Sequence, residues 1–451
     1  MHASRIRPMA IAATLCWAAV SMFSQPATAK TLCVNPAGSN GCYKTIQSAV
    51  NAASSYDVIK VAKGVYAEDV TIGKPLSLIG AGAQASVIDA TNLPNGILAD
   101  GLNNPGLRDV TIAGFTVKNA LYEGVLLLSA ADVVVRDDSI INNDTIGPVF
   151  GSGTACKGQP AYETDESGDC GGGLHLLGTS ASVVSSNFIS GNADGILISD
   201  ETAQSRNNLL IGNVVTDNPL ECGIVLASHP PVGSVPPQYA PHYGVDHNTV
   251  SENLVSKNGV KVGGAGAGVF SDGEGPGRVS NNVIVRNQLT GNGIPGFALH
   301  SHVGPAFGAP ADDLSGNMVI GNFISGNGAD TDDTATPGTA GININSGGGG
   351  SPVYGTVISQ NVIRDEDIAI AANTPTEVDA HMNELLNGKV GVANVCSFDS
   401  ASCSGSIDAT ENFWGCAAGP GSAGCASVGG PHVLFNPWLS RPVNGDKSNS
   451  Q

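Results

Sequence analysis

The sequence has 451 residues, of which 60 are glycine, 41% are apolar and only 13% are charged. Average domains contain about 7% glycine and about 25% charged residues, so this chain is rich in glycine and poor in charge. It is too apolar for a disordered chain and too poor in helix-forming residues for a helical bundle. A formal net charge of −19 argues against a nucleic-acid-binding protein, which needs a basic face. Composition therefore favours a turn-rich all-β protein.

The N-terminal residues 1–29 have the pattern of a secretory signal peptide. Arg5 and Arg7 form a basic region, residues 9–23 are mostly apolar, and Ala27-Thr28-Ala29 provides small residues for cleavage. No later segment has about 18 consecutive apolar residues, so we expect no membrane span. The sequence predicts a secreted protein, extracellular or periplasmic, and a monomer.

The cysteine pattern agrees with export. Eight cysteines fall into four close pairs, each of which brackets a loop rich in Gly or Ser: Cys33 with Cys42, Cys156 with Cys170, Cys396 with Cys403, and Cys416 with Cys425. We expect four short disulfides. Cys222 is left over, and we expect a buried, inert thiol there.

Residues 30–56 are predicted to form an N-terminal cap. Within residues 43–53, Ile46, Ala49, Val50 and Ala53 follow the i, i+3, i+4, i+7 spacing of a short amphipathic helix. Such a helix can cover one end of an apolar core.

Residues 57–405 contain internal repeats, which predict stacked coils. A glycine repeatedly precedes a short β-like run, as at Gly124, Gly173, Gly195, Gly223, Gly268, Gly296 and Gly341. Asparagines at five-residue steps follow, as at Asn208, Asn213 and Asn218. Short strands separated by one-residue bends are typical of a right-handed parallel β-helix. In such a solenoid, asparagines at inward bends hydrogen-bond one another from coil to coil.

Two segments resemble known β-helix proteins. Residues 57–70 and 76–82 are similar to the opening of the pectin-lyase-like superfamily, which includes pectinesterases and secreted right-handed β-helix repeat proteins. The run Asp-Ala-Thr-Glu-Asn-Phe-Trp-Gly at 408–415 resembles the closing motif of such repeat proteins. The pectinesterase catalytic segments Gln-Asp-Thr and Asp-Phe-Ile-Phe-Gly have no match, so the resemblance implies a fold and no activity. Residues 406–451 are expected to form a disulfide-stapled C-terminal cap.

Superposing the repeats on their glycines predicts which side chains share a face. Positions +1 and +3 are apolar and should face the core, so +2, +4 and +6 should face outward. The outward rows are Ser199, Ala227, Asp272, His300 and Asn345 at +4, and Glu201, His229, Glu274 and His302 at +6. This register puts Asp272 one coil below His300. His175, alone at +2 of an early coil, is interpreted as a surface residue.

These rows predict a site for acid–base chemistry on a polysaccharide. His300 would be the base, oriented by Asp272, with His229 or Tyr243 as proton donor. Substrate would be bound by His302, Asn345, Glu201, Tyr239 and His242. A divalent ion, Ca²⁺ for example, could be held by Asp200, Asp272 and Glu274. Insertions at residues 230–245, 303–313 and 347–355 would line a groove beside these rows.

Several functions fit this pattern. A polysaccharide lyase or a uronate epimerase needs cations to neutralise carboxylates, yet Lys and Arg total only 20 and none lies in the two rows. A glycoside hydrolase needs only two carboxylates. The alternative is a non-catalytic solenoid that binds carbohydrate or has a surface-structural or adhesive role.

Overall fold

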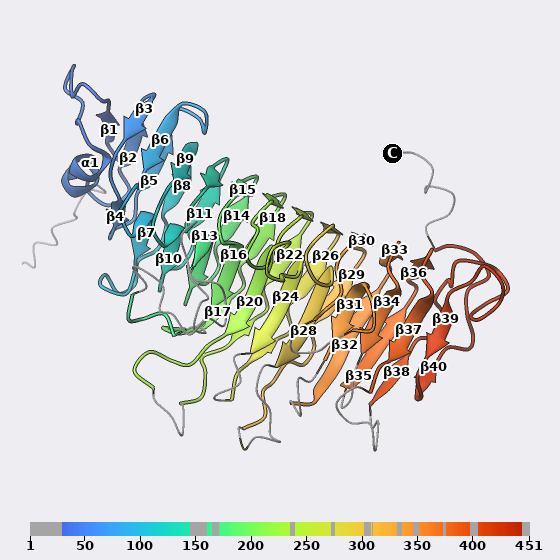
Figure 1. Ribbon diagram of the computed structural model, residues 1–451. Helices are drawn as coiled ribbons and strands as arrows, with labels where there is room; N and C mark the ends of the chain where they lie inside the picture. The colour runs from blue at the N-terminus through green and yellow to red at the C-terminus, as the bar shows by residue number, and fades with distance from the viewer. Residues whose placement is uncertain are drawn as a thin grey trace, which may run out of the picture.

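The computed structural model describes residues 29–144, 160–164, 171–234, 240–271, 276–301, 308, 310–331, 336–345, 351–372, 376–396 and 405–443. Its strands wind into coils that stack along one axis, from the N-terminal helix at one end to β39 and β40 at the other (Figure 1). Every strand pair among the described residues is parallel, so the predicted β-helix is confirmed. The expected signal peptide lies almost wholly outside the described residues. No helix in the described part of the chain is long and apolar enough to span a membrane.

Three long sheets form the walls of the solenoid. Sheet A runs in the order β1 (Thr31–Val34), β2 (Val58–Val61), β5 (Ser77–Gly80), β8 (Thr111–Ala113), β11 (Val134–Arg136), β14 (Val183–Ser185), β18 (Leu209–Ile211), β22 (Thr249–Ser251), β26 (Val283–Val285), β29 (Met318–Ile320), β32 (Val353–Ser359), β35 (Thr376–His381), β38 (Ser406–Asp408) and β40 (Val433–Leu434). Sheet B runs in the order β3 (Gly64–Tyr66), β6 (Ser86–Asp89), β9 (Phe115–Lys118), β12 (Ser139–Ile141), β15 (Phe188–Ser190), β19 (Val214–Thr216), β23 (Leu254–Ser256), β27 (Gln288–Thr290), β30 (Phe323–Ser325), β33 (Val362–Arg364) and β36 (Glu384–Leu386).

Sheet C carries the candidate site. It runs in the order β4 (Val70–Ile72), β7 (Asn95–Asp100), β10 (Glu123–Leu128), β13 (Gly172–Leu177), β16 (Asp194–Ser199), β20 (Ile224–Ser228), β24 (Ala267–Ser271), β28 (Phe297–Ser301), β31 (Ala340–Ile344), β34 (Ile368–Ala372), β37 (Val390–Asn394) and β39 (Ser427–Gly429). Three short strands, β17 (Ser205–Arg206), β21 (Val245–Asp246) and β25 (Val279–Ser280), add a small fourth sheet at the turn from sheet C to sheet A.

The core is one continuous apolar cluster inside the coils. In sheet C the +1 side chains stack on one another, as Leu174, Ile196 and Ile224 do, and each is at most 1% exposed. The prediction that +1 and +3 face the core is confirmed.

Glycine recurs in sheet C because the coils approach each other too closely there for a side chain. A Cβ added to Gly195 would lie 2.1 Å from the carbonyl oxygen of Gly223, and one on Gly223 would lie 2.6 Å from that of Gly266. The structure corrects the predicted register of the repeat that was counted from Gly268. Ala267 pairs with Ile224 and Phe297, so the glycine in line is Gly266 and not Gly268.

Asparagines at the bends form three ladders parallel to the axis, as predicted. At the bend between sheets A and B, Asn213 donates its Nδ2 hydrogens to Asn253 Oδ1 at 3.0 Å and to Val184 O at 3.0 Å. Its backbone N–H donates to the same Asn253 oxygen at 2.9 Å. The same pattern repeats from Asn187 to Asn412. Each buried amide is thereby satisfied, and the ladders fix the coil register.

The helix α1 (Ile46–Ala52) covers the N-terminal end and confirms the amphipathic pattern, with Ile46, Ala49 and Val50 buried. Glu68 accepts hydrogen bonds from the N–H groups of Ile46 and Gln47, so its carboxylate satisfies two unpaired donors at the helix start.

Two of the expected disulfides are present, Cys33–Cys42 near α1 and Cys416–Cys425 near the other end. Cys396 is disulfide-bonded, and its expected partner Cys403 lies outside the described residues.

The other cysteine expectations have different outcomes. Both Cys156 and Cys170 lie outside the described residues. The disulfide expected between Cys156 and Cys170 is therefore not among those that the structure describes, and it stays a prediction. Cys222, expected to be buried, is only half-buried, and its Sγ accepts the backbone N–H of Ala265 at 3.1 Å.

Candidate functional site

A hydrogen-bonded network of polar side chains lies on the outer face of sheet C, across β10, β13, β16 and β20. His175 on β13 is at its centre: Nδ1 lies 3.0 Å from Glu123 Oε1, and Nε2 lies 2.7 Å from Ser199 Oγ. The expectation that His175 is a surface residue is wrong, since it is 1% exposed. Outward side chains of neighbouring strands, including Leu126 and Leu177, form a second buried apolar cluster on this face.

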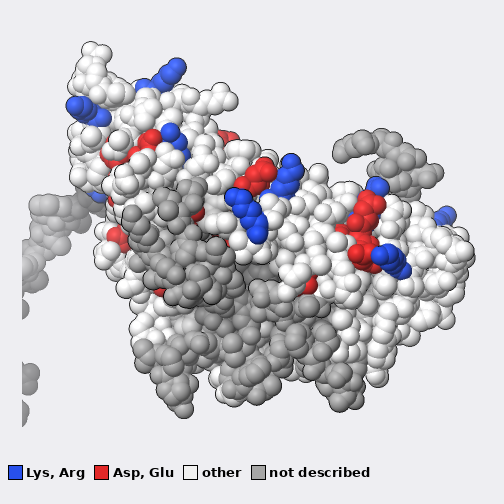
Figure 2. All heavy atoms as spheres, viewed as in Figure 1, with Lys and Arg blue, Asp and Glu red and all other residues white. Residues whose placement is uncertain are grey.

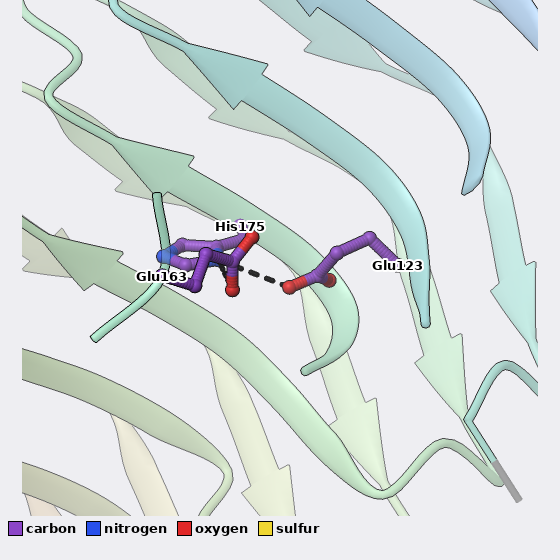
Figure 3. A group of neighbouring side chains, drawn as sticks. All are labelled: Glu123, Glu163 and His175. Carbon is purple, nitrogen blue, oxygen red and sulfur yellow. Dashed lines mark hydrogen bonds and ion pairs between the residues drawn. The ribbon is translucent and has the colours of Figure 1, made fainter. Parts of the chain in front are cut away.

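Two glutamates approach the ring of His175 from different segments (Figure 3). Glu123 lies at the start of β10, and its Oε2 accepts the N–H of Gly172 at 3.1 Å. Glu163, from the segment 160–164, places Oε2 3.7 Å from His175 Nδ1 and hydrogen-bonds the hydroxyl of Tyr122. The side chains of both glutamates are fully buried. Burial, with the charges of these two glutamates, raises the pKa of the neighbouring Tyr162.

The sequence did not single out these glutamates. Glu123 precedes the repeat glycine and so lies outside the rows +2 to +6, and Glu163 belongs to an insertion that repeats nowhere else. The sequence signal that could have indicated Glu123 is the position of its carboxylate, one residue before the repeat glycine Gly124.

The network continues from β13 to the end of β16. Ser199 Oγ donates to Glu201 Oε2 at 2.5 Å, and Glu201 Oε1 lies 2.7 Å from His229 Nδ1. Burial alone would raise the pKa of Glu201, but the neighbouring His229 and the hydrogen bonds from His229 and Ser199 hold it below its usual value. This carboxylate orients the His229 ring.

Asp200 lies beside Glu201 and His229, and its pKa is shifted in the opposite direction from that of Glu201. Its Oδ1 accepts the N–H of His229 at 2.9 Å, and its Oδ2 accepts the N–H of Gly244 and the hydroxyl of Ser228. Burial, reinforced by the charge of Glu201, raises the pKa of Asp200 to about 7. Both of its oxygens thus accept hydrogen bonds from N–H or O–H donors.

His242 completes the network. Its Nδ1 lies 2.9 Å from Ser228 Oγ, and its buried Nε2 has no hydrogen-bond partner within the described ranges. Burial, with the nearby charge of His229, lowers the pKa of His242 to about 4, so this imidazole is neutral at neutral pH.

The structure brings together four of the predicted site residues, namely Asp200, Glu201, His229 and His242. The predicted base, His300, pairs with Phe270 of β24, and the two rings lie 4.6 Å apart between centroids. The prediction for Asp272 counted from Gly268, whereas strand pairing puts Gly266 in line with the other repeat glycines, and Asp272 itself lies outside the described residues.

The other predicted residues lie apart or cannot be placed. Asn345 is buried after β31, where its N–H donates to Leu299 O, while Tyr243 is 49% exposed. Four of the predicted residues lie outside the described part of the chain: Tyr239, Asp272, Glu274 and His302.

Comparisons with known proteins concern the fold. Residues 86–235 match the family described as right handed beta helix region. The search of curated proteins gave no match. Among solved structures, the catalytic domain of a GH87 alpha-1,3-glucanase variant in complex with tetrasaccharides is 13% identical with a TM-score of 0.52, covering 91% of this chain and 68% of that one.

Two further solved structures were matched. The pre-mature bacteriophage phi29 gene product 12 is 12% identical with a TM-score of 0.50, covering 79% of this chain and 48% of that one. The A-module of Azotobacter vinelandii mannuronan C-5 epimerase AlgE4 is 13% identical with a TM-score of 0.45, covering 88% and 94%. The chain thus forms a parallel β-helix over its described residues, and residues 86–235 match the right-handed β-helix family model.

Proposed function

We propose that the chain is an enzyme that hydrolyses a neutral polysaccharide by general acid–base catalysis. The observation that carries this proposal is the pair Asp200 and Glu201. These two adjacent, buried carboxyl groups have pKa values shifted in opposite directions, one raised to about 7 and one lowered. Such a pair supplies an acid and a base at the same pH.

Each group then has a defined role. Asp200, protonated below about pH 7, donates its proton to the glycosidic oxygen as the C–O bond breaks. Glu201 takes a proton from the attacking water through His229, whose Nδ1 it holds at 2.7 Å. The water oxygen forms the new bond to the anomeric carbon. His229 and His242 keep slight exposure, 5% and 8% respectively.

The charge of the site favours a neutral glycan over a uronan. Within the described residues, Asp200, Glu201 and His242 form hydrogen bonds with hydroxyls, imidazoles and backbone N–H groups. The guanidinium of Arg278, whose backbone N–H reaches Ser228, is held by Asp246 at 2.6 Å. On the face in Figure 2, Lys and Arg lie mostly in small groups next to Asp and Glu. A uronan needs cations that neutralise its carboxylates.

The fold is compatible with this substrate class, since the GH87 glucanase domain that shares it was solved with tetrasaccharides. The disulfides near both ends support a protein that works outside the cytoplasm. Polysaccharides are present there as substrates or as structural polymers.

The test is a substrate screen with the purified chain. Neutral α- and β-glucans, mannans and xylans are incubated alongside alginate and pectate, with and without Ca²⁺. New reducing ends from a neutral glycan, abolished by Glu201→Gln and retained by His247→Asn, would support the proposal. His247 is a matched control because its side chain is 62% exposed and pairs with Asp246. Unsaturated ends from alginate or pectate would indicate a lyase and contradict the proposal.

A non-catalytic carbohydrate-binding solenoid is the second candidate. The near-complete burial of Glu123, His175 and Ser199 favours it, because a buried polar network also serves to fix a sheet face. Binding of a glycan without turnover, with an affinity that Glu201→Gln leaves unchanged, would select this alternative.

A further inference from the structure

Glu123, Glu163 and His175 form a compact set of N and O donors at the β10–β13 end of the network (Figure 3). One potential ligand atom from each lies within 4.8 Å of the others. His175 Nδ1 is 3.0 Å from Glu123 Oε1 and 3.7 Å from Glu163 Oε2. Tetrahedral bonds of about 2.1 Å separate neighbouring ligand atoms by about 3.4 Å, which lies between the two observed distances.

Each of these side chains is also held by an outer hydrogen bond. The second nitrogen of His175 meets Ser199 Oγ at 2.7 Å, and Ser199 in turn bonds Glu201. Glu123 Oε2 accepts the N–H of Gly172, and Glu163 bonds the hydroxyl of Tyr122. Metal-binding imidazoles and carboxylates are characteristically fixed in this way by neighbouring groups.

The backbone conformation around Glu123 also favours a metal site. A Cβ at Gly171, where φ is +79°, would lie 2.9 Å from Glu123 Oε1. The chain therefore passes close over this carboxylate, and two glutamates are enclosed against one imidazole. Burying two carboxylates together is costly unless a positive charge accompanies them.

We propose that Glu123, Glu163 and His175 bind a transition-metal dication of the Zn²⁺ class. One nitrogen and two carboxylate oxygens suit Zn²⁺ or Co²⁺, whereas Ca²⁺ takes six to eight oxygen ligands. The ion joins the segment 160–164 to β10 and β13, so its role is to hold this segment against sheet C. This inference is independent of the Ca²⁺ set expected from the sequence, with which it shares no residue.

The test uses the full-length chain after chelator treatment and dialysis. Isothermal titration with Zn²⁺ should give one tight site per chain, and Co²⁺ should give a visible d–d absorption of low coordination number. Bound metal should raise the melting temperature. Glu163→Gln should weaken Zn²⁺ affinity at least about 100-fold, while Glu366→Gln, a matched change at another buried glutamate, should leave it unchanged.

The outcomes separate this inference from the proposed activity. Absence of a stoichiometric site, or wild-type affinity in both Glu163→Gln and Glu163→Ala, would overturn the metal site whatever the glycan assays show. If Glu163→Gln does not fold, Tyr122→Phe replaces it, with a loss of 10- to 100-fold in affinity expected for an outer partner and no loss contradicting the site. Metal binding without glycan turnover would leave the metal site standing and contradict the hydrolase.

Discussion

Replacing Asp138 with asparagine should stabilise the protein, and increasingly so as the pH rises. Asp138 occupies a position in the bend between sheets A and B that asparagine fills in the following coils, from Asn187 onward. Its Oδ1 accepts the N–H of Phe115 at 2.7 Å, and its buried Oδ2 has no hydrogen-bond partner in the part of the chain that the structure describes. Burial, with a small contribution from the charge of Asp137, raises the pKa of Asp138 to about 8.

The magnitude follows from the difference between the folded and unfolded pKa values. Between about pH 4 and about pH 8 the folded state keeps the Asp138 proton that the unfolded state releases, so stability falls as the pH rises through this window. Each pKa unit corresponds to about 1.4 kcal/mol. Between pH 3.8, the ordinary pKa of an aspartate, and neutral pH, the loss in free energy of unfolding caused by Asp138 grows to about 4 kcal/mol. Asparagine does not titrate, so the substitution removes this loss.

Asparagine at 138 also gains a donor. In the next coil, Asn187 Nδ2 donates to Val135 O and to Asn213 Oδ1. Val135 pairs with Ile112 in the sheet, so Nδ2 at position 138 is expected to donate to the carbonyl of Ile112 and to Asn187 Oδ1. The ladder would then begin one coil earlier.

Urea unfolding of wild type and Asp138→Asn at about pH 5 and about pH 8 measures the effect. We expect a small gain near pH 5, of about 2 kcal/mol, and a gain at least twice as large near pH 8. Asp137→Asn is the neighbouring control, because that side chain is 54% exposed. A gain independent of pH, or a variant less stable than wild type near pH 8, would refute the account of the buried carboxyl.

Three further changes test other parts of the structure. Gly223→Ala should destabilise the protein by about 1–3 kcal/mol or more, because the new Cβ would lie 2.3 Å from Val255 Cγ1 and 2.6 Å from Gly266 O; an unchanged urea midpoint would contradict the close-approach explanation. Glu366→Gln should stabilise the protein more at about pH 7 than at about pH 4, since burial raises the pKa of Glu366 to about 7. Equal gains in melting temperature at the two pH values would contradict this explanation. The kcat/KM of glycan hydrolysis should fall as the pH rises through about 7, where Asp200 loses its proton, and a rate that rises through this range would show that Asp200 is not the acid.

The fold could be predicted from the sequence because stacked coils require the same residue types at the same position of each coil. Glycine recurs where a Cβ would strike the next coil, and asparagine recurs where a bend leaves backbone groups to be paired inside the solenoid. Both requirements are local to one coil, so they are visible in each repeat.

The candidate site is less predictable, because it depends on features that do not repeat. The run Gly263-Gly264-Ala265-Gly266-Ala267-Gly268 offers several glycines for one register position, and only strand pairing selects Gly266. Glu123 and His175 are 52 residues apart, with an insertion between them. The burial of the outer face of sheet C, which makes His175 an interior residue, comes from side chains that the repeat pattern treats as exposed.

The most direct measurement of the central claim is the release of reducing ends from a neutral glucan by four matched proteins: wild type, Asp200→Asn, Glu201→Gln and His247→Asn. If Asp200 and Glu201 are the acid and the base, both of their variants lose at least about 100-fold in kcat with unchanged melting cooperativity, while His247→Asn retains wild-type activity. Turnover that survives in Asp200→Asn and Glu201→Gln would contradict the assignment of these carboxyls as the catalytic pair.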